Sequence, residues 1–313
     1  MMWGLALCCV SVLGLTYVHS VEIVDVVDDF AKTECQGTHV GFGFSGGHEF
    51  HYEALKRRYK DCTYVEGNLE ITNLVNSANI TYDLSFLSQI EVVTGYVLIG
   101  LLDVENIPLT SLKLIRADNT YNIMGEEYGL VLALTAEAEG KEFQKENTTD
   151  GVETEIYRHG LVELQLPSLK EISKGKVLFY KNPMLCFVNT VNWHVIVPGR
   201  EDPVNYGDDA YRFDCPLECD PACQVGDEFA HCWGRNPLMC QRHEAPVWCH
   251  PDCPGRCYDG YILGCCHPEC AIGCYGPRDT DCVLCKYFKH EGRCISSCPA
   301  GISYRKGQEC IRL

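Results

Sequence analysis

The segment Ser111-Leu112-Lys113-Leu114-Ile115 decides the fold, because two other segments repeat its leucine followed three residues later by isoleucine. The other copies are FLSQI at 86–90, which lies 25 residues earlier in the chain, and SLKEI at 168–172, which lies 57 residues later. A period of about 20–30 residues with one short strand per unit is typical of a solenoid, whose repeats bury their apolar faces only against neighbours. The repeat therefore predicts stacked parallel sheets rather than an ordinary α/β domain.

Short β-rich runs occur before, between and after these copies, at 69–72, 96–99, 130–134, 161–166 and 177–180. One helix is predicted over 49–59, where an apolar set recurs at roughly helical spacing. Its members are Phe50, Ala54, Leu55 and Tyr59, with the basic residues 56–58 facing outward. If Cys35 and Cys62 on either side of it pair, the disulfide staples this helix over the open end of the solenoid and contributes about 3–4 kcal/mol.

Composition divides the 313 residues into two parts. Of the 22 cysteines, 17 lie in residues 215–313, where the net charge is −2, whereas the rest of the chain carries −15. The total of −17 and a pI near 5.0 argue against nucleic-acid binding, which needs a basic surface. So many cysteines indicate an oxidising compartment. The acidic stretch 137–155 is predicted to be an exposed loop inserted between repeats.

The first 20 residues predict a secretory signal peptide. An uncharged apolar run from Trp3 to Leu15 is too short to span a bilayer, and no later stretch is long enough. We therefore expect a secreted, extracellular protein without a membrane span, and N-linked glycans at the sequons that begin at Asn79 and Asn147. Removal of this peptide takes away Cys8 and Cys9 and leaves 20 cysteines.

The cysteines of residues 215–313 follow a repeated spacing. Two consecutive sets are separated by 4, 4 and 8 residues, beginning at Cys249 and Cys266, and a variant set with separations of 4, 9 and 8 begins at Cys219. This repetition predicts a serial rod held by disulfides, in a region with too few apolar residues for a core. Zinc is the alternative, because Cys282 and Cys285 have ligand spacing. Spacing alone does not fix which cysteines pair.

Several strings resemble the extracellular region of the epidermal growth factor receptor family, over almost the whole chain after the signal peptide. They are CQGT (35–38), GNLEIT (67–72), YDLSFL (82–87), GYVLI (95–99), NPMLC (182–186), CWG (232–234) and GPRDTDC (276–282). The resemblance implies a mainly β fold: a receptor L domain built as a right-handed β-helix over 21–214, then a truncated, disulfide-rich furin-like rod over 215–313. Trp233 looks like the family tryptophan that plugs the end of the L-domain core.

The same resemblance implies ten disulfides that use all 20 cysteines. The implied pairs are Cys35–Cys62, Cys186–Cys215, Cys219–Cys232, Cys223–Cys240, Cys249–Cys257, Cys253–Cys265, Cys266–Cys274, Cys270–Cys282, Cys285–Cys294 and Cys298–Cys310.

Family members bind growth factor on one face of the L domain, partly by strand addition along the N-terminal segment. By position, the residues implied for this face are Phe42, Phe44, Ser45, Asn73, Leu101 and Tyr121. Core burial explains Phe42 and Phe44 equally well. The chain departs from the family pattern at Asn73, where an aromatic residue is typical, and in an insertion at about 74–81. Only 11 residues separate Cys298 from Cys310, where the family carries a dimerisation arm.

Catalysis is not expected. Residues 43–47 match G-x-S-x-G, and Gly41, Gly43 and Gly46 match G-x-G-x-x-G, but neither lies in the strand context that its chemistry needs. His48 and His51 could share a helical face as metal ligands, although exposed histidines explain them as well. Kinase motifs in their usual order are absent from the sequence, and no cofactor or metal is expected.

The sequence thus predicts a secreted, truncated ectodomain, monomeric and non-catalytic, that binds an EGF-like growth factor or a receptor ectodomain and modulates signalling. The alternative is the N-terminal part, or an incomplete gene model, of a transmembrane receptor tyrosine kinase. A structural or matrix protein that kept the fold and lost the ligand remains a third possibility.

Overall fold

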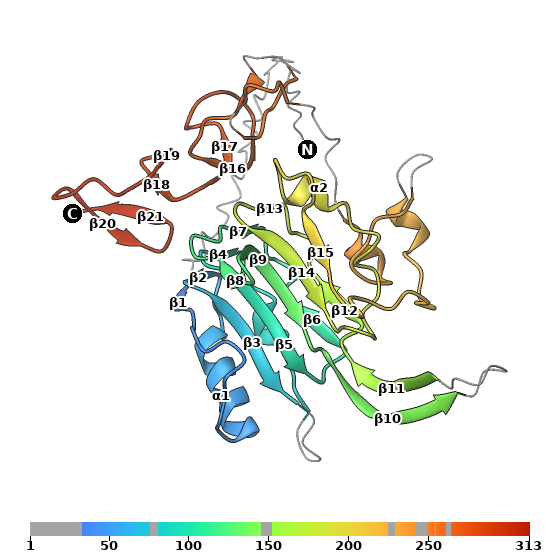
Figure 1. Ribbon diagram of the computed structural model, residues 1–313. Coiled ribbons are helices and arrows are strands. Elements are labelled where there is room, and N and C mark those ends of the chain that lie inside the picture. Colours follow the sequence, from blue (N-terminus) through green and yellow to red (C-terminus); the bar gives the residue numbers. More distant parts are fainter. Residues whose placement is uncertain are drawn as a thin grey trace, which may run out of the picture. The chain divides into compact units, whose positions relative to one another are not determined.

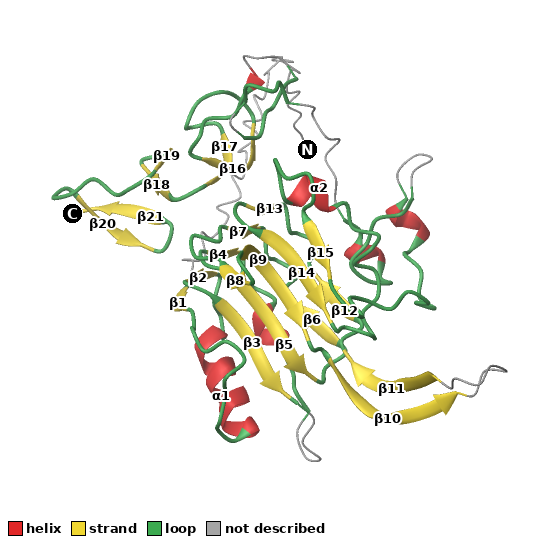
Figure 2. Ribbon diagram, in the orientation of Figure 1, coloured by secondary structure: helices red, strands yellow, loops and turns green. Residues whose placement is uncertain are grey.

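The computed structural model describes residues 33–75, 81–144, 152–224, 229–241, 249–253, 255–260 and 264–313. The predicted signal peptide and both sequon asparagines, Asn79 and Asn147, lie outside these residues. Within them the fold is mainly β with few helices, as predicted (Figures 1 and 2). No helix in the described ranges has the length and apolar character that crossing a bilayer requires.

Parallel sheets organise the first part of the chain. One sheet follows the order β1 (Glu34–Gln36), β2 (Tyr64–Glu66), β4 (Val92–Val93), β7 (Leu114–Ile115) and β13 (Glu171–Ile172), and every pair is parallel. A larger sheet contains β3 (Leu69–Leu74), β5 (Val97–Leu102), β9 (Glu126–Ala133), β14 (Lys176–Tyr180) and β15 (Val204–Tyr206), again parallel. The chain alternates between the two sheets, which confirms the predicted stacking of parallel strands.

Three smaller strand pairings complete this part. Parallel strands β6 (Asn106–Pro108) and β12 (Glu163–Gln165) form a third side, near the short 3-10 helix η1 (Ser85–Leu87). Strand β8 (Tyr121–Ile123) pairs antiparallel with β9. The described residues of the stretch predicted as an acidic loop, 137–144 and 152–155, instead lie on two antiparallel strands, β10 (Ala136–Gln144) and β11 (Val152–Gly160). The expectation of a loop was wrong for these residues because a high density of charge does not prevent the two halves of one stretch from pairing as strands.

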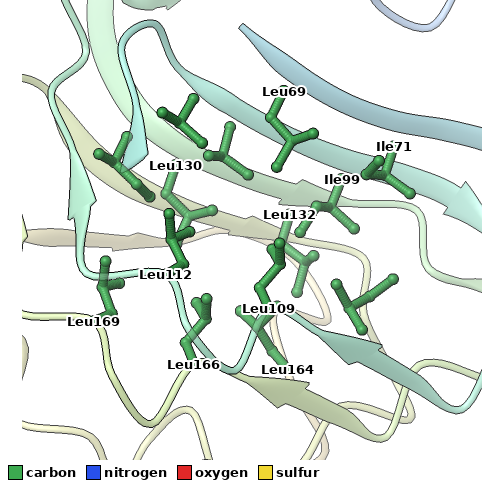
Figure 3. Packing of buried hydrophobic residues seen from close by; sticks show 14 of the residues in the cluster. Leu69, Ile71, Ile99, Leu109, Leu112, Leu130, Leu132, Leu164, Leu166 and Leu169 are labelled. Atoms are coloured by element: carbon green, nitrogen blue, oxygen red, sulfur yellow. The ribbon is translucent and has the colours of Figure 1, made fainter. Parts of the chain in front are cut away.

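The main core lies between these sheets, where apolar side chains from successive repeats pack against one another (Figure 3). All six leucine and isoleucine positions of the predicted repeat are buried there. Their register differs from the prediction, since Val93, not Ile90, pairs with Ile115, which pairs in turn with Ile172. The first copy in register is therefore Ile90 to Val93. Aliphatic residues three residues apart occur in both frames, as Leu87 with Ile90 and as Ile90 with Val93, so spacing alone could not choose between them.

Helix α1 (His48–Tyr59) confirms the predicted helix and, at Leu55 and Tyr59, part of its predicted buried face. The buried residues are Tyr52, Leu55 and Tyr59, whereas Phe50 is 69% exposed. Tyr52, Leu55 and Tyr59 follow the i, i+3, i+7 spacing of one helical stripe, which leaves Phe50 on the opposite side. A second short helix, α2 (Trp193–Ile196), places Trp193 in the core.

The second part of the chain contains short elements between disulfides. They are η2 (Pro221–Cys223), η3 (Pro237–Met239), β16 (Cys270–Cys274), β17 (Cys282–Cys285), β18 (Phe288–His290), β19 (Arg293–Ile295), β20 (Ser303–Lys306) and β21 (Glu309–Arg312). Ten disulfides are present, and they coincide pair by pair with those implied by the resemblance. No thiol pair therefore remains at Cys282 and Cys285 to bind zinc, and the described residues contain no metal-binding cluster.

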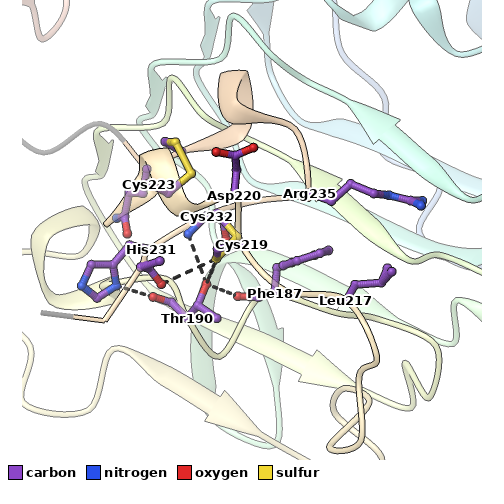
Figure 4. Close-up of a disulfide and its surroundings, with 12 residues drawn as sticks. Phe187, Thr190, Leu217, Cys219, Asp220, Cys223, His231, Cys232 and Arg235 are labelled. Carbon is purple, nitrogen blue, oxygen red and sulfur yellow. Dashed lines mark hydrogen bonds between the residues drawn. A yellow bond between two sulfur atoms is a disulfide. The ribbon is translucent and has the colours of Figure 1, made fainter. Parts of the chain in front are cut away.

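Local hydrogen bonds fix the first of these disulfide-linked modules to the sheets (Figure 4). The hydroxyl of Thr190 donates to the carbonyl of Cys232 at 3.1 Å, and it also lies 3.2 Å from the Cys232 amide. Next in sequence, Trp233 is 1% exposed and belongs to the main core. Its ring meets Trp193 edge-on with centroids 5.3 Å apart. The cysteine-rich part thus supplies one side chain of the core that the sheets enclose.

Candidate ligand-binding face

The outer side of the larger sheet carries a second apolar cluster, distinct from the core. Its buried members point away from the solenoid interior because side chains alternate along a strand. They are Tyr96, Leu98, Tyr128, Val131, Ala133 and Leu178. Four partly buried residues pack against them, namely Phe42, Tyr121, Ile123 and Leu134. Two of the six predicted ligand residues, Phe42 and Tyr121, thus lie on this outer face.

Residues 38–42 cross this face along β3, and the outward side chains of that strand region hold them. Asn68 donates to the carbonyl of Thr38 at 3.2 Å. The carboxylate of Glu70 accepts the amides of Val40 at 2.6 Å and Gly41 at 3.1 Å. The hydroxyl of Thr72 donates to the Gly41 carbonyl at 3.0 Å. These three polar side chains are buried, so their hydrogen bonds to the crossing segment satisfy groups that would otherwise be costly to bury.

Glu70 is the central anchor of the segment. Burial alone would raise its pKa, but the hydrogen bonds from the Val40 amide, the Tyr96 hydroxyl and the Gly41 amide outweigh burial and lower the pKa below its ordinary value. The same arrangement raises the pKa of Tyr96, through burial and through its 2.7 Å hydrogen bond to the carboxylate. Glu70 is therefore ionised at neutral pH and bound to two backbone donors.

This anchor predicts a pH-dependent loosening of the segment. Since the pKa of Glu70 is lower in the folded protein, its stabilising contribution is complete above the unfolded value of about 4.3 and is lost as pH falls through the folded value. We expect hydrogen-exchange protection factors of the Val40 and Gly41 amides to drop over that acidic range. In Glu70→Gln they should already be low at neutral pH; unchanged protection in that variant would contradict the anchor.

Phe42 lies over a gap left by a glycine of β5. A Cβ atom on Gly100 would lie 2.5 Å from the Phe42 ring and 2.3 Å from the Ala133 carbonyl oxygen, so only glycine fits. The ring also meets Tyr121 edge-on, with centroids 6.4 Å apart. Phe44 packs differently, against His51 at 4.1 Å. Ser45, the next residue after Phe44, is exposed. Burial raises the pKa of the Tyr121 hydroxyl above its ordinary value.

Asn73 and Leu101 belong to a column of residues at the ends of adjacent strands. Each has a positive φ, as do Leu134 and Lys181 on the following strands. Asn73 lies between Thr72 and Leu74, which pair with Gly100 and Leu102, and Leu101 and Leu134 directly follow the paired residues Gly100 and Ala133. Non-glycine residues in this conformation are strained and cluster at functional sites. The predicted site residues did not include Leu134 and Lys181, which share this backbone conformation.

The two histidines considered as metal ligands have another role. A ring nitrogen of His51 lies 2.7 Å from the carbonyl oxygen of Thr72, and one of His48 lies 3.3 Å from that of Asn73. Both rings thus attach α1 to the end of β3. The described residues place Phe44, Ser45, Asn73 and Leu101 near this end, whereas Phe42 and Tyr121 lie further along the face.

Comparison with known proteins agrees with this architecture. The sequence matches the family "Receptor L domain" over residues 61–197 and the family "Furin-like cysteine rich region" over residues 211–313. Both are non-catalytic ectodomain families.

Curated relatives are similar over most of the chain. It is 35% identical to the epidermal growth factor receptor of Drosophila melanogaster over 87% of this chain, and 35% identical to receptor tyrosine-protein kinase erbB-2 of Mus musculus over 86%. It is 33% identical over 96% of its length to the epidermal growth factor receptor of Gallus gallus. The chain spans only 17%, 20% and 38% of the lengths of these three relatives. It therefore belongs to the epidermal growth factor receptor family, of which it carries a receptor L domain and a furin-like cysteine-rich region.

Proposed function

We propose that the protein is a secreted, non-catalytic ectodomain that binds an EGF-like growth factor, or a receptor ectodomain, and so modulates signalling. The observation that carries this proposal is the anchored segment 38–42 on the outer face, continued by residues 43–46. Next to it, Phe44, Asn73 and Leu101 stay half-buried and Ser45 exposed. A face that combines a fixed backbone with partly exposed apolar side chains suits a protein ligand.

The remaining family features extend this proposal. We infer a right-handed β-helix over residues 21–214, because parallel strands joined by crossovers are almost always connected with that hand. A furin-like rod would follow over 215–313. Signal-peptide cleavage after residue 20 and glycans at Asn79 and Asn147 belong to the same inference, and intact-mass analysis of the secreted protein tests all three. Sedimentation tests the expected monomer.

Binding to a panel of EGF-like growth factors from the same organism tests the proposed function. The purified, oxidised chain is titrated with each factor. We expect Leu101→Ala and Phe44→Ala each to weaken binding about tenfold, the loss typical of a contact near the centre of an interface. The matched control is Tyr275→Ala, which removes a largely exposed ring from the cysteine-rich part.

Two outcomes would contradict growth-factor binding at this face. If a folded monomer binds none of the factors, ligand sequestration is excluded and a receptor ectodomain becomes the partner to test. If Tyr275→Ala weakens binding as much as Leu101→Ala, the face is misplaced.

The second candidate function is that of the extracellular part of a receptor tyrosine kinase. It is favoured because the chain covers only a small part of the length of its relatives. Transcript mapping beyond the codon for Leu313 separates the two.

A further inference from the structure

The larger sheet has one edge whose backbone is open. Strand β15 is last in the sheet order and, among the described strands, pairs only with β14 (Figure 1). The carbonyl of Pro203 accepts the amide of Val177, and the amide of Gly207 donates to the carbonyl of Phe179. Since alternate residues of a strand face the same neighbour, the amides and carbonyls of Val204 and Tyr206 point away from β14. Among the described residues they meet no backbone partner on that side.

A row of aromatic rings leads from the core to this open edge. Phe179 in the core stacks on Tyr206 with centroids 5.8 Å apart, Tyr206 meets Tyr211 at 5.5 Å, and Tyr211 meets Phe213 at 4.6 Å. Tyr206 is 44% exposed, Tyr211 is partly buried against the core, and Phe213 at the end of the row is 81% exposed. Closing the end of the core accounts for the positions of the inner rings. It does not account for Phe213, which is largely exposed. We call Tyr206, Tyr211 and Phe213 the aromatic ledge.

The charge around the open edge is negative. Four exposed carboxylates flank β15 in sequence, at Glu201, Asp202, Asp208 and Asp209. No side-chain hydrogen bond or ion pair links them to other described residues, whereas Asp214 nearby is paired with Arg212 at 3.0 Å. A second copy of the chain would bring the same four carboxylates to the edge and be repelled. A basic segment would be attracted, and its cations could lie on the exposed ring of Phe213.

We propose that β15 and the aromatic ledge form a second binding site, which takes a basic peptide segment in extended conformation as an additional strand of the sheet. The added strand would bond to the outward amides and carbonyls of Val204 and Tyr206. Its lysine or arginine side chains would lie between the carboxylates and on the ledge. This site is separate from the growth-factor face and does not depend on the function proposed for it.

The test uses the full secreted chain and an acetylated, amidated peptide of alternating lysine and valine, about eight residues long, within the usual length of a strand. We expect saturable binding that weakens as salt rises, because exposed charges are screened. A peptide of the same sequence with alternate backbone amides methylated should not bind, since it keeps the charge but loses the strand hydrogen bonds. A glutamate-valine peptide should not bind either.

Variants locate the site. Phe213→Ala should weaken binding of the basic peptide about two- to fivefold, the range of an exposed cation–π contact. The matched control is Phe229→Ala, which removes a ring that is 91% exposed in the cysteine-rich part and should change nothing. Asp209→Asn keeps the left-handed backbone that Asp209 adopts, and should weaken binding while leaving thermal stability unchanged.

Three results would overturn the proposal. Equal binding by Phe213→Ala and the parent would remove the ledge from the site. Equal binding of the methylated peptide would show charge attraction without strand addition. An absence of binding at millimolar peptide would mean that the carboxylates only protect the edge from pairing, as charged residues on edge strands commonly do.

Discussion

Replacing Trp233 with alanine is expected to lower the free energy of unfolding by about 3–5 kcal/mol, the cost typical of removing a fully buried tryptophan. The side chain comes from the cysteine-rich part but fills space in the core of the sheets, against Trp193. The backbone around it is fixed by the Cys219–Cys232 disulfide and by the amide of Trp233, which donates to the Met239 carbonyl at 2.8 Å. The surroundings therefore cannot collapse into the space left by the ring.

Chemical denaturation without reductant measures this effect, with all ten disulfides intact. The matched control is Leu238→Ala, which shortens an exposed side chain of the same module and should change stability by less than about 0.5 kcal/mol. A loss below about 1 kcal/mol in Trp233→Ala would show that the ring is not part of a common core. The two parts of the chain would then be stabilised separately.

The stacking of strands could be predicted from the sequence because each repeat must present apolar residues at the same places. Leu112 and Ile115 recur as Leu169 and Ile172, and all four are buried. The register of the first copy could not be predicted, since Leu87, Ile90 and Val93 offer two equivalent frames. The buried side of α1 had the same ambiguity, because Phe50 and Tyr52 are both large and close to a helical stripe. Only packing against the strands chooses between such frames.

The candidate site was predictable only in part. Phe42 and Tyr121 were placed on one face by resemblance, and the structure brings them into contact. Glu70 was missed, although the sequence holds a signal: a carboxylate within the apolar run Leu69-Glu70-Ile71 needs buried partners. Those partners are amides 29 and 30 residues away, which no local pattern identifies. The left-handed column at Asn73 and Leu101 was equally invisible, because leucine is not a residue typical of that conformation.

Removing the Cys35–Cys62 disulfide, as Cys35→Ala with Cys62→Ala, is expected to cost about 3–4 kcal/mol. The two cysteines are 27 residues apart, and the loop-closure entropy of the unfolded chain over that distance gives this magnitude. The loop they close contains both the segment held by Glu70 and helix α1. Cys62 is fully buried, and Cys35 lies on β1, at the edge of the smaller sheet. The bond thus fixes both ends of the stretch that carries Phe42 and Phe44.

Trypsin provides a direct measurement, because Lys56, Arg57 and Arg58 lie in the last turn of α1. A folded helix resists cleavage, so the rate follows the population of the opened loop when reclosing is fast. A loss of about 3 kcal/mol should increase that population and the native-state cleavage rate about a hundredfold. The control pair, Cys249→Ala with Cys257→Ala, removes a bond of separation 8 from the cysteine-rich part and should leave cleavage in α1 unchanged. Equal cleavage rates in the parent and in the variant that lacks Cys35 and Cys62 would contradict this prediction. Glu70, His48 and His51 would then hold the segment without the disulfide. Growth-factor binding should in that case survive removal of the disulfide.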